Sequence, residues 1–382
     1  MKVLFIVSDF DMGGITSSLR NLSALLLEKG HEVHILNLPK SKLPNDFNRN
    51  IKLIEIEGRA RYWNTSISDV YKAKGLKKIK LLLIGLFKKI LNKADKWNKF
   101  IFKRCFWSGY DVAIGFRQSP LCFYLAQEKT DAFRKVGFWH GEIDMMGDVS
   151  SWMHYSYGLD RLACVSNAVA KGVENRYPLL KGKTCTVYNV FDDNKIKQLS
   201  LVPFQEYSSE VFNIVTVARI EFEQKQLDWI PIICKKLKAD GLCFRWHIVG
   251  DGPDREKLCK LIKDNQVEDV LILCGSKTNP YPYIKNARLL LLLSSWESYG
   301  MVVMESLICN TPVVAAYYPA LPEILTDGDT GLIAENSVDG VYRAVKRAMQ
   351  DDILYNHLKQ NCLKYEYDRE TAWKQFIGMV NN

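Results

Sequence analysis

Short apolar segments rich in valine, isoleucine and leucine alternate with longer amphipathic segments along almost the whole chain of 382 residues. This alternation is typical of a parallel β-sheet with helices on both faces, because such strands are buried on both sides while each covering helix keeps one polar face. It predicts an α/β fold of doubly wound parallel sheets. In the first half the expected strands are Val3–Val7, Glu32–Asn37, Lys52–Ile56, Asp111–Gly115, Lys135–Trp139, Leu162–Ser166 and Thr184–Asn189.

The series of strands starts again near residue 212, which indicates a second domain of the same kind. Residues 199–211 contain a proline and several polar residues without sustained periodicity, so we expect the boundary there. The expected domains are 1–199 and 212–365, with a last helix over 366–382 that packs back on the first domain. In the second domain the expected strands are Asn213–Val217, Arg245–Val249, Val270–Cys274, Leu289–Leu293, Pro312–Ala316 and Gly331–Ala334.

The positive charge of the chain is concentrated in one segment. The formal net charge is +9, but residues 71–104 carry 12 basic side chains and one acidic one, Asp95, a local net of +11. The remainder has 40 basic and 42 acidic residues, a net of −2. A nucleic-acid-binding body is therefore disfavoured, because tracking a phosphate backbone needs positive charge spread along the surface.

The ten cysteines never form a Cys-x-x-Cys pair, and most lie in apolar runs. They indicate buried small side chains in a reducing compartment, not disulfides or a zinc site. The N-terminus lacks a cleavable signal pattern, and no stretch approaches the roughly 20 apolar residues of a membrane span. We therefore expect a cytoplasmic protein.

Two stretches of the first half place polar or flexible residues after a strand, where doubly wound sheets bind ligands. Gly13 and Gly14 open a helix after the first strand, so backbone amides there can approach an anion. A tight turn before a helix is the alternative interpretation. A dinucleotide site is disfavoured, because no G-x-G-x-x-G is present and the second strand ends in Asn37. His140 ends a later strand, where it can contact a polar substrate or be a structural histidine.

In the second half, cations and carboxylates follow two strands. Arg219 closes one strand and Lys225 lies six residues later, without a charge partner being obligatory for either. Such a pair suits a diphosphate, although two solvated surface cations are the alternative. Glu297 lies just before a helix and Glu305 follows eight residues later on a similar face. Because that helix is otherwise apolar, unpaired acids on it favour a functional interpretation.

These motifs resemble the retaining glycosyltransferases of family 4, which have the GT-B fold of two Rossmann-like domains facing across a cleft. The resemblance covers nearly the whole chain. It rests on the two glutamates separated by seven residues, on Gly300 after the S-x-x-E turn, on Gly13-Gly14 and on His140. Further matches are TVYNVFD, HIVGDGPDREKL and the segment from Gly275 to the first glutamate. The chain departs from the family at Val190, where proline is usual, at Ala218 and Gln226, where glycine is common, and in the spacing from Arg219 to Lys225.

The resemblance implies a nucleoside-diphosphate sugar donor held mainly by the second domain. Arg219 and Lys225 would neutralise the diphosphate, so that no metal and no other cofactor is expected. Glu305 would hold the ribose hydroxyls, and Glu297 the sugar, together with the amides of Ser298, Tyr299 and Gly300. The amide of Gly14 would reach the phosphate, and His140 would touch the sugar and the acceptor side.

The basic segment also carries an apolar stripe at helical spacing, over Leu76, Ile79, Leu83, Leu86, Ile90, Ala94, Trp97 and Ile101. Such a helix can lie in an anionic lipid surface, or it can pack on the first domain with a solvated basic face. We expect membrane contact. The residues expected to make it are Lys77, Lys78, Lys80, Lys88, Lys89 and Trp97.

The resulting hypothesis is a retaining glycosyltransferase that moves a hexose-type sugar from a nucleoside diphosphate, expected to be UDP, to a saccharide acceptor. The acceptor is expected to be lipid-linked and to belong to bacterial surface polysaccharide (capsule) synthesis at the inner face of the membrane, with the enzyme bound peripherally. Two alternatives stay open, a nucleotide-sugar epimerase of the same fold and a non-catalytic membrane-binding partner subunit. No nucleic-acid partner is expected.

Overall fold

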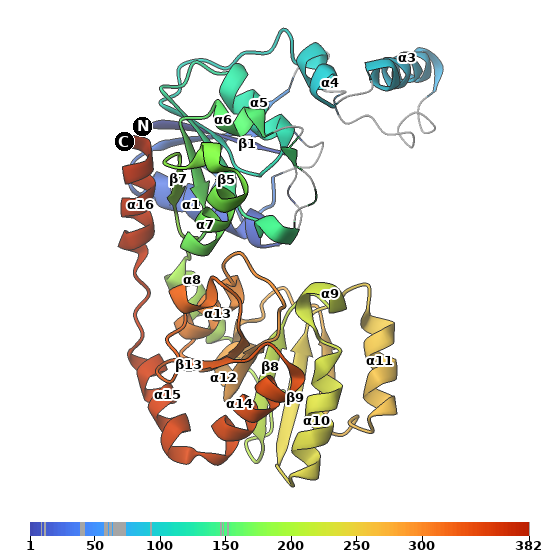
Figure 1. Ribbon diagram of the computed structural model, residues 1–382, viewed down its shortest axis with the longest axis vertical. Helices are drawn as coiled ribbons and strands as arrows, with labels where there is room; N and C mark the ends of the chain where they lie inside the picture. The colour runs from blue at the N-terminus through green and yellow to red at the C-terminus, as the bar shows by residue number, and fades with distance from the viewer. Residues whose placement is uncertain are drawn as a thin grey trace. The chain divides into compact units, whose positions relative to one another are not determined.

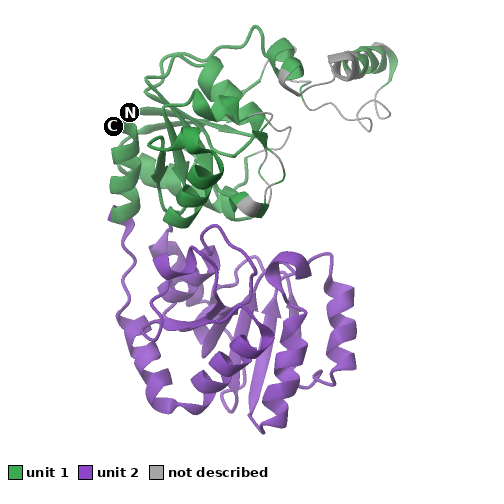
Figure 2. Cartoon of the chain, in the orientation of Figure 1, with its two compact units in different colours: residues 1–190, 371–382 green, residues 191–370 purple. Residues whose placement is uncertain are grey.

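The computed structural model describes residues 1–8, 10, 13–38, 43–56, 60, 63, 74–91, 94–145, 147, 149–150 and 153–381, without the side chains of residues 76, 77, 85, 87–91, 94, 95 and 144. The chain forms two compact units, residues 1–190 with 371–382 and residues 191–370 (Figure 2). Each unit is described by itself.

The first unit is built around a seven-stranded parallel sheet in the order β3-β2-β1-β4-β5-β6-β7 (Figure 1). Its strands occupy the apolar runs that the sequence predicts, because side chains such as Phe5, Ile114 and Phe138 are buried completely or nearly so. The strands are β1 (Lys2–Val7), β2 (Glu32–Asn37), β3 (Lys52–Glu55), β4 (Val112–Gly115), β5 (Arg134–Trp139), β6 (Arg161–Cys164) and β7 (Thr184–Thr186).

Two helices of this unit, α5 (Pro120–Glu128) and α7 (Asn167–Arg176), begin at a serine cap. Ser119 accepts a hydrogen bond from the Cys122 amide and precedes Pro120, and Ser166 caps the next long helix in the same way. The helices are α1 (Gly14–Glu28), α3 (Gly75–Leu91), α4 (Ala94–Ile101), α5 (Pro120–Glu128), α6 (His154–Tyr157) and α7 (Asn167–Arg176).

The second unit has a six-stranded parallel sheet in the order β10-β9-β8-β11-β12-β13. Its buried core brings Trp246 and Leu291 of the sheet together with Ile230, Val345 and Leu358 of the covering helices. Its strands are β8 (Phe212–Val217), β9 (Phe244–Val249), β10 (Leu271–Gly275), β11 (Leu289–Leu292), β12 (Val313–Ala316) and β13 (Gly331–Ala334). The main helices are α8 (Asp193–Ser200), α9 (Phe222–Lys225), α10 (Trp229–Ala239), α11 (Arg255–Asp264), α12 (Tyr281–Asn286), α13 (Met301–Ile308), α14 (Val338–Gln350) and α15 (Asp352–Lys364).

The division between the units differs from the expected boundary at residues 199–211, because it falls between Val190 and Phe191. Helix α8 accounts for the difference. It packs on α12 and α13, and the Asn279 side chain donates to the Leu199 carbonyl oxygen at 2.9 Å. The chain returns to the first unit in α16 (Arg369–Asn381), whose Phe376 and Val380 lie in the same core as β1 and β4.

The predicted fold class, α/β with two Rossmann-like parallel sheets, is confirmed by these two sheets. All ten cysteines are free, but Cys243 is exposed rather than buried. None of the described helices is long and apolar enough to cross a membrane.

Candidate functional site

The strand order of the second unit determines where a ligand site can form. Strands β8 and β11 are neighbours, with Leu289 paired to Ile214. The chain continues from β8 to β9 toward one edge of the sheet and from β11 to β12 toward the other edge. Such a reversal point is where doubly wound sheets bind ligands, beyond the carboxyl ends of the strands. Arg219 and Lys225 follow β8, whereas Glu297 to Gly300 follow β11. The fold therefore brings the predicted cations and carboxylates to one edge.

Two glycines hold the backbone of the loop after β8. A Cβ atom added to Gly250 would lie 1.9 Å from the Ala218 carbonyl oxygen, and one added to Gly252 would lie 2.3 Å from the Ile220 carbonyl oxygen. The close approach lets the Ile220 amide donate to the Asp251 carbonyl oxygen at 3.0 Å. The G-x-G stretch thus fixes the backbone on both sides of Arg219.

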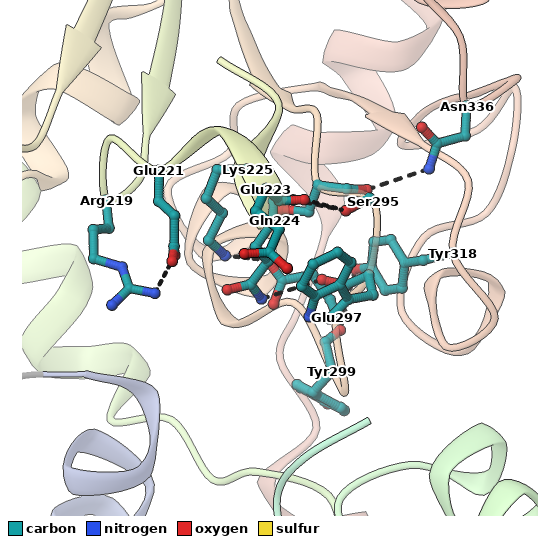
Figure 3. A network of polar contacts seen from close by, with 12 residues as sticks. Arg219, Glu221, Glu223, Gln224, Lys225, Ser295, Glu297, Tyr299, Tyr318 and Asn336 are labelled. Atoms are coloured by element: carbon teal, nitrogen blue, oxygen red, sulfur yellow. Dashed lines mark hydrogen bonds and ion pairs between the residues drawn. The ribbon is translucent and has the colours of Figure 1, made fainter. Parts of the chain in front are cut away.

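Both cations have a carboxylate partner within the second unit (Figure 3). Arg219 pairs with Glu221, and its side chain is still 60% exposed. Lys225, at the end of α9, pairs with Glu297 across the two loops, and both side chains are largely buried, at 17% and 15% exposed. The sequence analysis missed Glu221 as a partner, although it lies only two residues after Arg219.

Glu297 is oriented by a second contact, because Ser294 Oγ donates to its Oε1 at 2.8 Å. The same carboxylate oxygen therefore receives both a hydroxyl and an ammonium group. A group that accepts charge-assisted hydrogen bonds from two sides keeps one orientation, which is what a ligand-binding carboxylate requires.

The two loops are also joined directly. Ser295 donates its amide to the Gln224 carbonyl oxygen at 2.8 Å and its hydroxyl to the Glu223 carbonyl oxygen at 3.0 Å. In return, the Gln224 side chain donates to the Trp296 carbonyl oxygen at 3.2 Å. These bonds keep α9 against the turn after β11, so the pairing of Lys225 with Glu297 rests on a fixed backbone.

Gly300 turns the chain from this loop into α13. Its φ of +89° lies in the left-handed region, and an added Cβ would lie 2.0 Å from the Tyr318 hydroxyl oxygen. That hydroxyl donates to the Tyr299 carbonyl oxygen at 3.2 Å. The Tyr299 side chain is buried, so any ligand contact of this residue is through its backbone, while Ser298 is half-buried.

Glu305 is the fifth residue of α13, about one turn from its start, and is half-buried. The Tyr281 hydroxyl, at the start of α12, approaches its Oε1 at 3.5 Å. The sequence analysis did not single out Tyr281, and no signal short of the fold connects residues 24 positions apart.

The two candidates of the first unit lie after β1 and β5. Helix α1 begins at Gly14, and Gly13 before it is extended with no atom within 4 Å of an added Cβ. His140 is only 7% exposed, and its ring packs on Phe116 and Phe138 with centroids 4.7 and 5.6 Å away. Burial lowers the pKa of His140 to about 4. A hydrogen bond to the Phe116 backbone raises the pKa, but its effect is smaller than that of burial. Its Nε2 has no hydrogen-bond partner among the described residues.

The sequence predicts that Trp97 makes membrane contact, and its burial contradicts this prediction. Its side chain is 4% exposed, and its Nε1 donates to the Trp63 carbonyl oxygen at 3.0 Å. Lys78 and Lys80 are exposed on α3. Lys77, Lys88 and Lys89 belong to the same helix, but their side chains lie outside the described residues.

A metal site is not formed within the described part of the chain, where no three histidine, cysteine or acidic side chains gather closely enough to hold an ion.

Residues 204–365 match the family model of the glycosyl transferases group 1. Three curated relatives show what the sequence is similar to. An N-acetyl-alpha-D-glucosaminyl L-malate synthase of Bacillus anthracis is 24% identical over 67% of this chain and 68% of its own. A putative colanic acid biosynthesis glycosyltransferase WcaL of Salmonella typhimurium is 31% identical over 34% of each chain. An N-acetylgalactosamine-N,N'-diacetylbacillosaminyl-diphospho-undecaprenol 4-alpha-N-acetylgalactosaminyltransferase of Campylobacter jejuni is 27% identical over 45% of this chain and 46% of its own.

The chain thus spans about two thirds of the first relative and less than half of the other two. Two solved structures match it from end to end. TarM of S. aureus, in complex with Fondaparinux, alpha-GlcNAc-glycerol and UDP, has a TM-score of 0.71 at 14% identity and covers 100% of both chains. HepE of Anabaena, in complex with UDP and glucose, has a TM-score of 0.69 at 13% identity, covering 100% of this chain and 97% of its own. The chain therefore has the GT-B fold of these solved structures, and the similarity to the glycosyl transferases group 1 family covers residues 204–365.

Proposed function

We propose that the protein is a retaining glycosyltransferase that moves a hexose-type sugar from a nucleoside diphosphate, UDP in the first instance, to a saccharide acceptor. The observation that carries this proposal is the ion pair of Lys225 with Glu297, with Arg219 in the same loop after β8, at the edge where β8 and β11 are neighbours. Two cations there suit a diphosphate, and the neighbouring carboxylate suits the hydroxyls of the sugar attached to it. The solved structures of TarM and HepE with UDP support the choice of donor.

Each residue then has a role in breaking the bond between the anomeric carbon and the phosphate. Arg219 and Lys225 stabilise the negative charge that develops on the departing diphosphate. Lys225 leaves Glu297 when the donor enters, so the carboxylate becomes available to the sugar hydroxyls. Glu305 accepts hydrogen bonds from the ribose hydroxyls, and the amides of Ser298, Tyr299 and Gly300 face the sugar.

Retention of configuration follows if the acceptor attacks from the face that the leaving group vacates. The acceptor oxygen forms the new bond to the anomeric carbon, and its proton passes to the departing phosphate oxygen. No carboxylate acts as a nucleophile in this scheme, which distinguishes it from retaining glycosidases. Gly14 contributes an amide to the phosphate, and His140, neutral near pH 7, contacts the sugar and the acceptor. The two cations neutralise the diphosphate, so we expect full activity after treatment with a metal chelator.

The acceptor in this proposal is a lipid-linked saccharide of bacterial surface polysaccharide (capsule) synthesis, and the enzyme works at the cytoplasmic face of the membrane. The support comes from the relatives, since one acts on a diphospho-undecaprenol saccharide and another is a putative colanic acid enzyme.

A panel of UDP-, GDP- and ADP-sugars tests the proposal through the nucleotide that appears. Arg219→Ala and Glu305→Ala should each abolish release while the circular dichroism spectrum and the melting temperature stay near those of the parent. The matched controls are Arg343→Ala and Glu335→Ala, which remove a solvent-exposed ion pair elsewhere in the same unit and should leave release unchanged. Full activity in either site variant would refute the site. A free isomerised donor would indicate an epimerase, and an inverted product would refute retention.

A further inference from the structure

Helix α3 of the first unit carries a row of large apolar side chains on its solvent side. Ile79, Leu82, Leu83 and Leu86 are between 48% and 56% exposed. At 100° per residue these four positions fall within an arc of about 100°, so they form one continuous stripe. Leu81 is on the opposite side and is 4% exposed, so the helix has an inner face and a separate outer one.

The charge around the stripe has one sign. Lys78 and Lys80 are both exposed and lie about 100° to either side of its centre. Helix α3 contains no aspartate or glutamate, and residues 71–104 hold one acid among 12 basic residues. The rest of the chain carries a net charge of −2, so this cluster is a local feature and not part of a generally basic surface.

Helix α4 supplies the attachment to the body of the unit. Trp97 and Ile101 are buried, as is Phe102 directly after the helix, and Trp97 Nε1 is bonded to the Trp63 carbonyl oxygen. Lys99 lies 6.0 Å from the centre of the Tyr155 ring. The aromatic side chain that the sequence placed at the lipid surface thus belongs to the protein interior, and the outward-facing apolar surface is on α3.

We propose that the stripe of α3, Ile79, Leu82, Leu83 and Leu86, docks on an anionic lipid surface with the helix axis parallel to the bilayer plane. The helix has 17 residues, about 26 Å, and cannot span a bilayer with basic residues along it. A row of aliphatic side chains with an exposed lysine on each side suits an interface, where the aliphatics enter the acyl boundary and the lysines reach the phosphates. A protein partner would need an acidic groove, whereas anionic headgroups supply that charge uniformly on both sides of the stripe.

Co-sedimentation of the full chain with vesicles of 70% phosphatidylcholine and 30% phosphatidylglycerol tests this proposal. Leu83→Ser with Leu86→Ser should reduce binding at least about tenfold. Lys78→Gln with Lys80→Gln should reduce it by about fivefold for each lysine, and 0.5 M NaCl should have a similar effect on the parent. Vesicles of phosphatidylcholine alone should bind the parent weakly.

Matched controls come from the second unit. Ile353→Ser with Leu363→Ser removes two exposed aliphatics from α15, and Lys260→Gln with Lys263→Gln removes two exposed cations from α11. Both should bind vesicles as the parent does. Equal binding by the parent and the Leu83/Leu86 variant would overturn the proposal. A second result would also overturn it: the parent does not sediment with vesicles and is a dimer in light scattering, while the Leu83/Leu86 variant is a monomer. A second copy of the chain would then cover the stripe. Sedimentation reads binding alone, so the result is independent of any transferase activity.

Discussion

At the scale of single residues, each cation of the proposed donor site has its own carboxylate partner. Arg219 pairs with Glu221 and Lys225 with Glu297, so in the proposed function a diphosphate displaces one carboxylate for each cation that it gains. The two displacements differ in kind. Glu297 has a further partner in Ser294, and the proposed function gives it a role toward the sugar, whereas it gives Glu221 no role other than competition with the donor.

Glu221→Gln should therefore tighten donor binding. An exposed ion pair contributes up to about 1 kcal/mol, so the donor KM should fall by about two- to fivefold with little change in kcat. The measurement is nucleotide release over a range of donor concentrations. Glu223→Gln is the control, since it removes the same charge from an exposed position on α9. If both variants lower the KM equally, general electrostatics explains the effect and the competition does not.

Gly300 should be required for the stability of the second unit. Alanine there would take on a left-handed φ and place its Cβ against the Tyr318 hydroxyl, so the free energy of unfolding should fall by about 2–5 kcal/mol. Gly328→Ala is the control, because Gly328 has a φ of +76° and open space around its Cβ. It should cost only about 1–2 kcal/mol.

Urea unfolding of the full chain, followed by fluorescence, measures both costs. Tyr318→Phe in the Gly300→Ala background should recover part of the loss, since it removes the nearest atom but leaves Cζ at 3.1 Å. Equal losses at Gly300 and Gly328 would show that the contact with Tyr318 is unimportant.

At the scale of elements, apolar runs predicted the strands well, because a buried parallel strand needs apolar side chains on both faces. The ends were less predictable. The run Thr184–Asn189 continues past β7, which ends at Thr186, because Val187 just beyond the strand is still buried in the core. The apolar stripe over residues 76–101 was likewise predicted only in part. Periodicity identified its amphipathic character, but only the fold shows that α4 turns Trp97 inward while α3 keeps Leu83 outside.

The residues of the proposed site stand out in the sequence, whereas their contacts do not. Glu305 stands out because an acid on an apolar helix needs a reason, and Glu297 because it lies just before the same helix. Their partners come from other strands and helices, Lys225 after β8 and Tyr281 on α12, so no local pattern could connect them.

His140, directly after β5, should make the stability of the first unit depend on pH. The unfolded chain takes up a proton with the ordinary pKa of 6.5, whereas burial holds the folded pKa at about 4. The unfolded state thus binds more protons between these values, so the contribution is complete above pH 6.5 and is lost as the pH falls toward 4. Between pH 7 and pH 5 the free energy of unfolding should decrease by about 2 kcal/mol through this residue.

The measurement is the slope of unfolding free energy against pH. His140→Gln should reduce the slope in this interval, whatever its effect on the absolute stability, and the exposed His154→Gln should leave it as in the parent. An unchanged slope in His140→Gln would mean that the buried ring does not resist protonation.

At the scale of the whole molecule, the chain passes between its two units twice, at residues 190 and 370. The first passage was misplaced from the sequence because a polar, proline-containing stretch at 199–211 looks like a linker, whereas α8 before it already packs on the second unit. Phe191 starts this attachment, because its amide donates a hydrogen bond to the Tyr367 hydroxyl oxygen at 3.1 Å. Composition identifies flexible polar segments, but only contacts decide to which core a helix belongs.

The second passage makes the stability of the first unit depend on the last residues of the chain. Phe376 of α16 is completely buried in the core of that unit, and Arg134 of β5 donates to the Val380 carbonyl oxygen at 2.9 Å. Phe376→Ala removes a buried aromatic ring and should lower the free energy of unfolding of the first unit by about 3–5 kcal/mol. Lys374→Ala, at an exposed position of the same helix, should cost less than about 0.5 kcal/mol.

Hydrogen exchange resolves the two units, because peptides from β1 and β4 report on the first and peptides from β8 and β11 on the second. We expect Phe376→Ala to speed exchange in β1 and β4 while β8 and β11 keep the protection of the parent. Equal loss in both units would mean that they unfold as one cooperative body. Unchanged protection in β1 and β4 would mean that α16 covers the first unit without stabilising it, and the assignment of residues 371–382 to that core would fail.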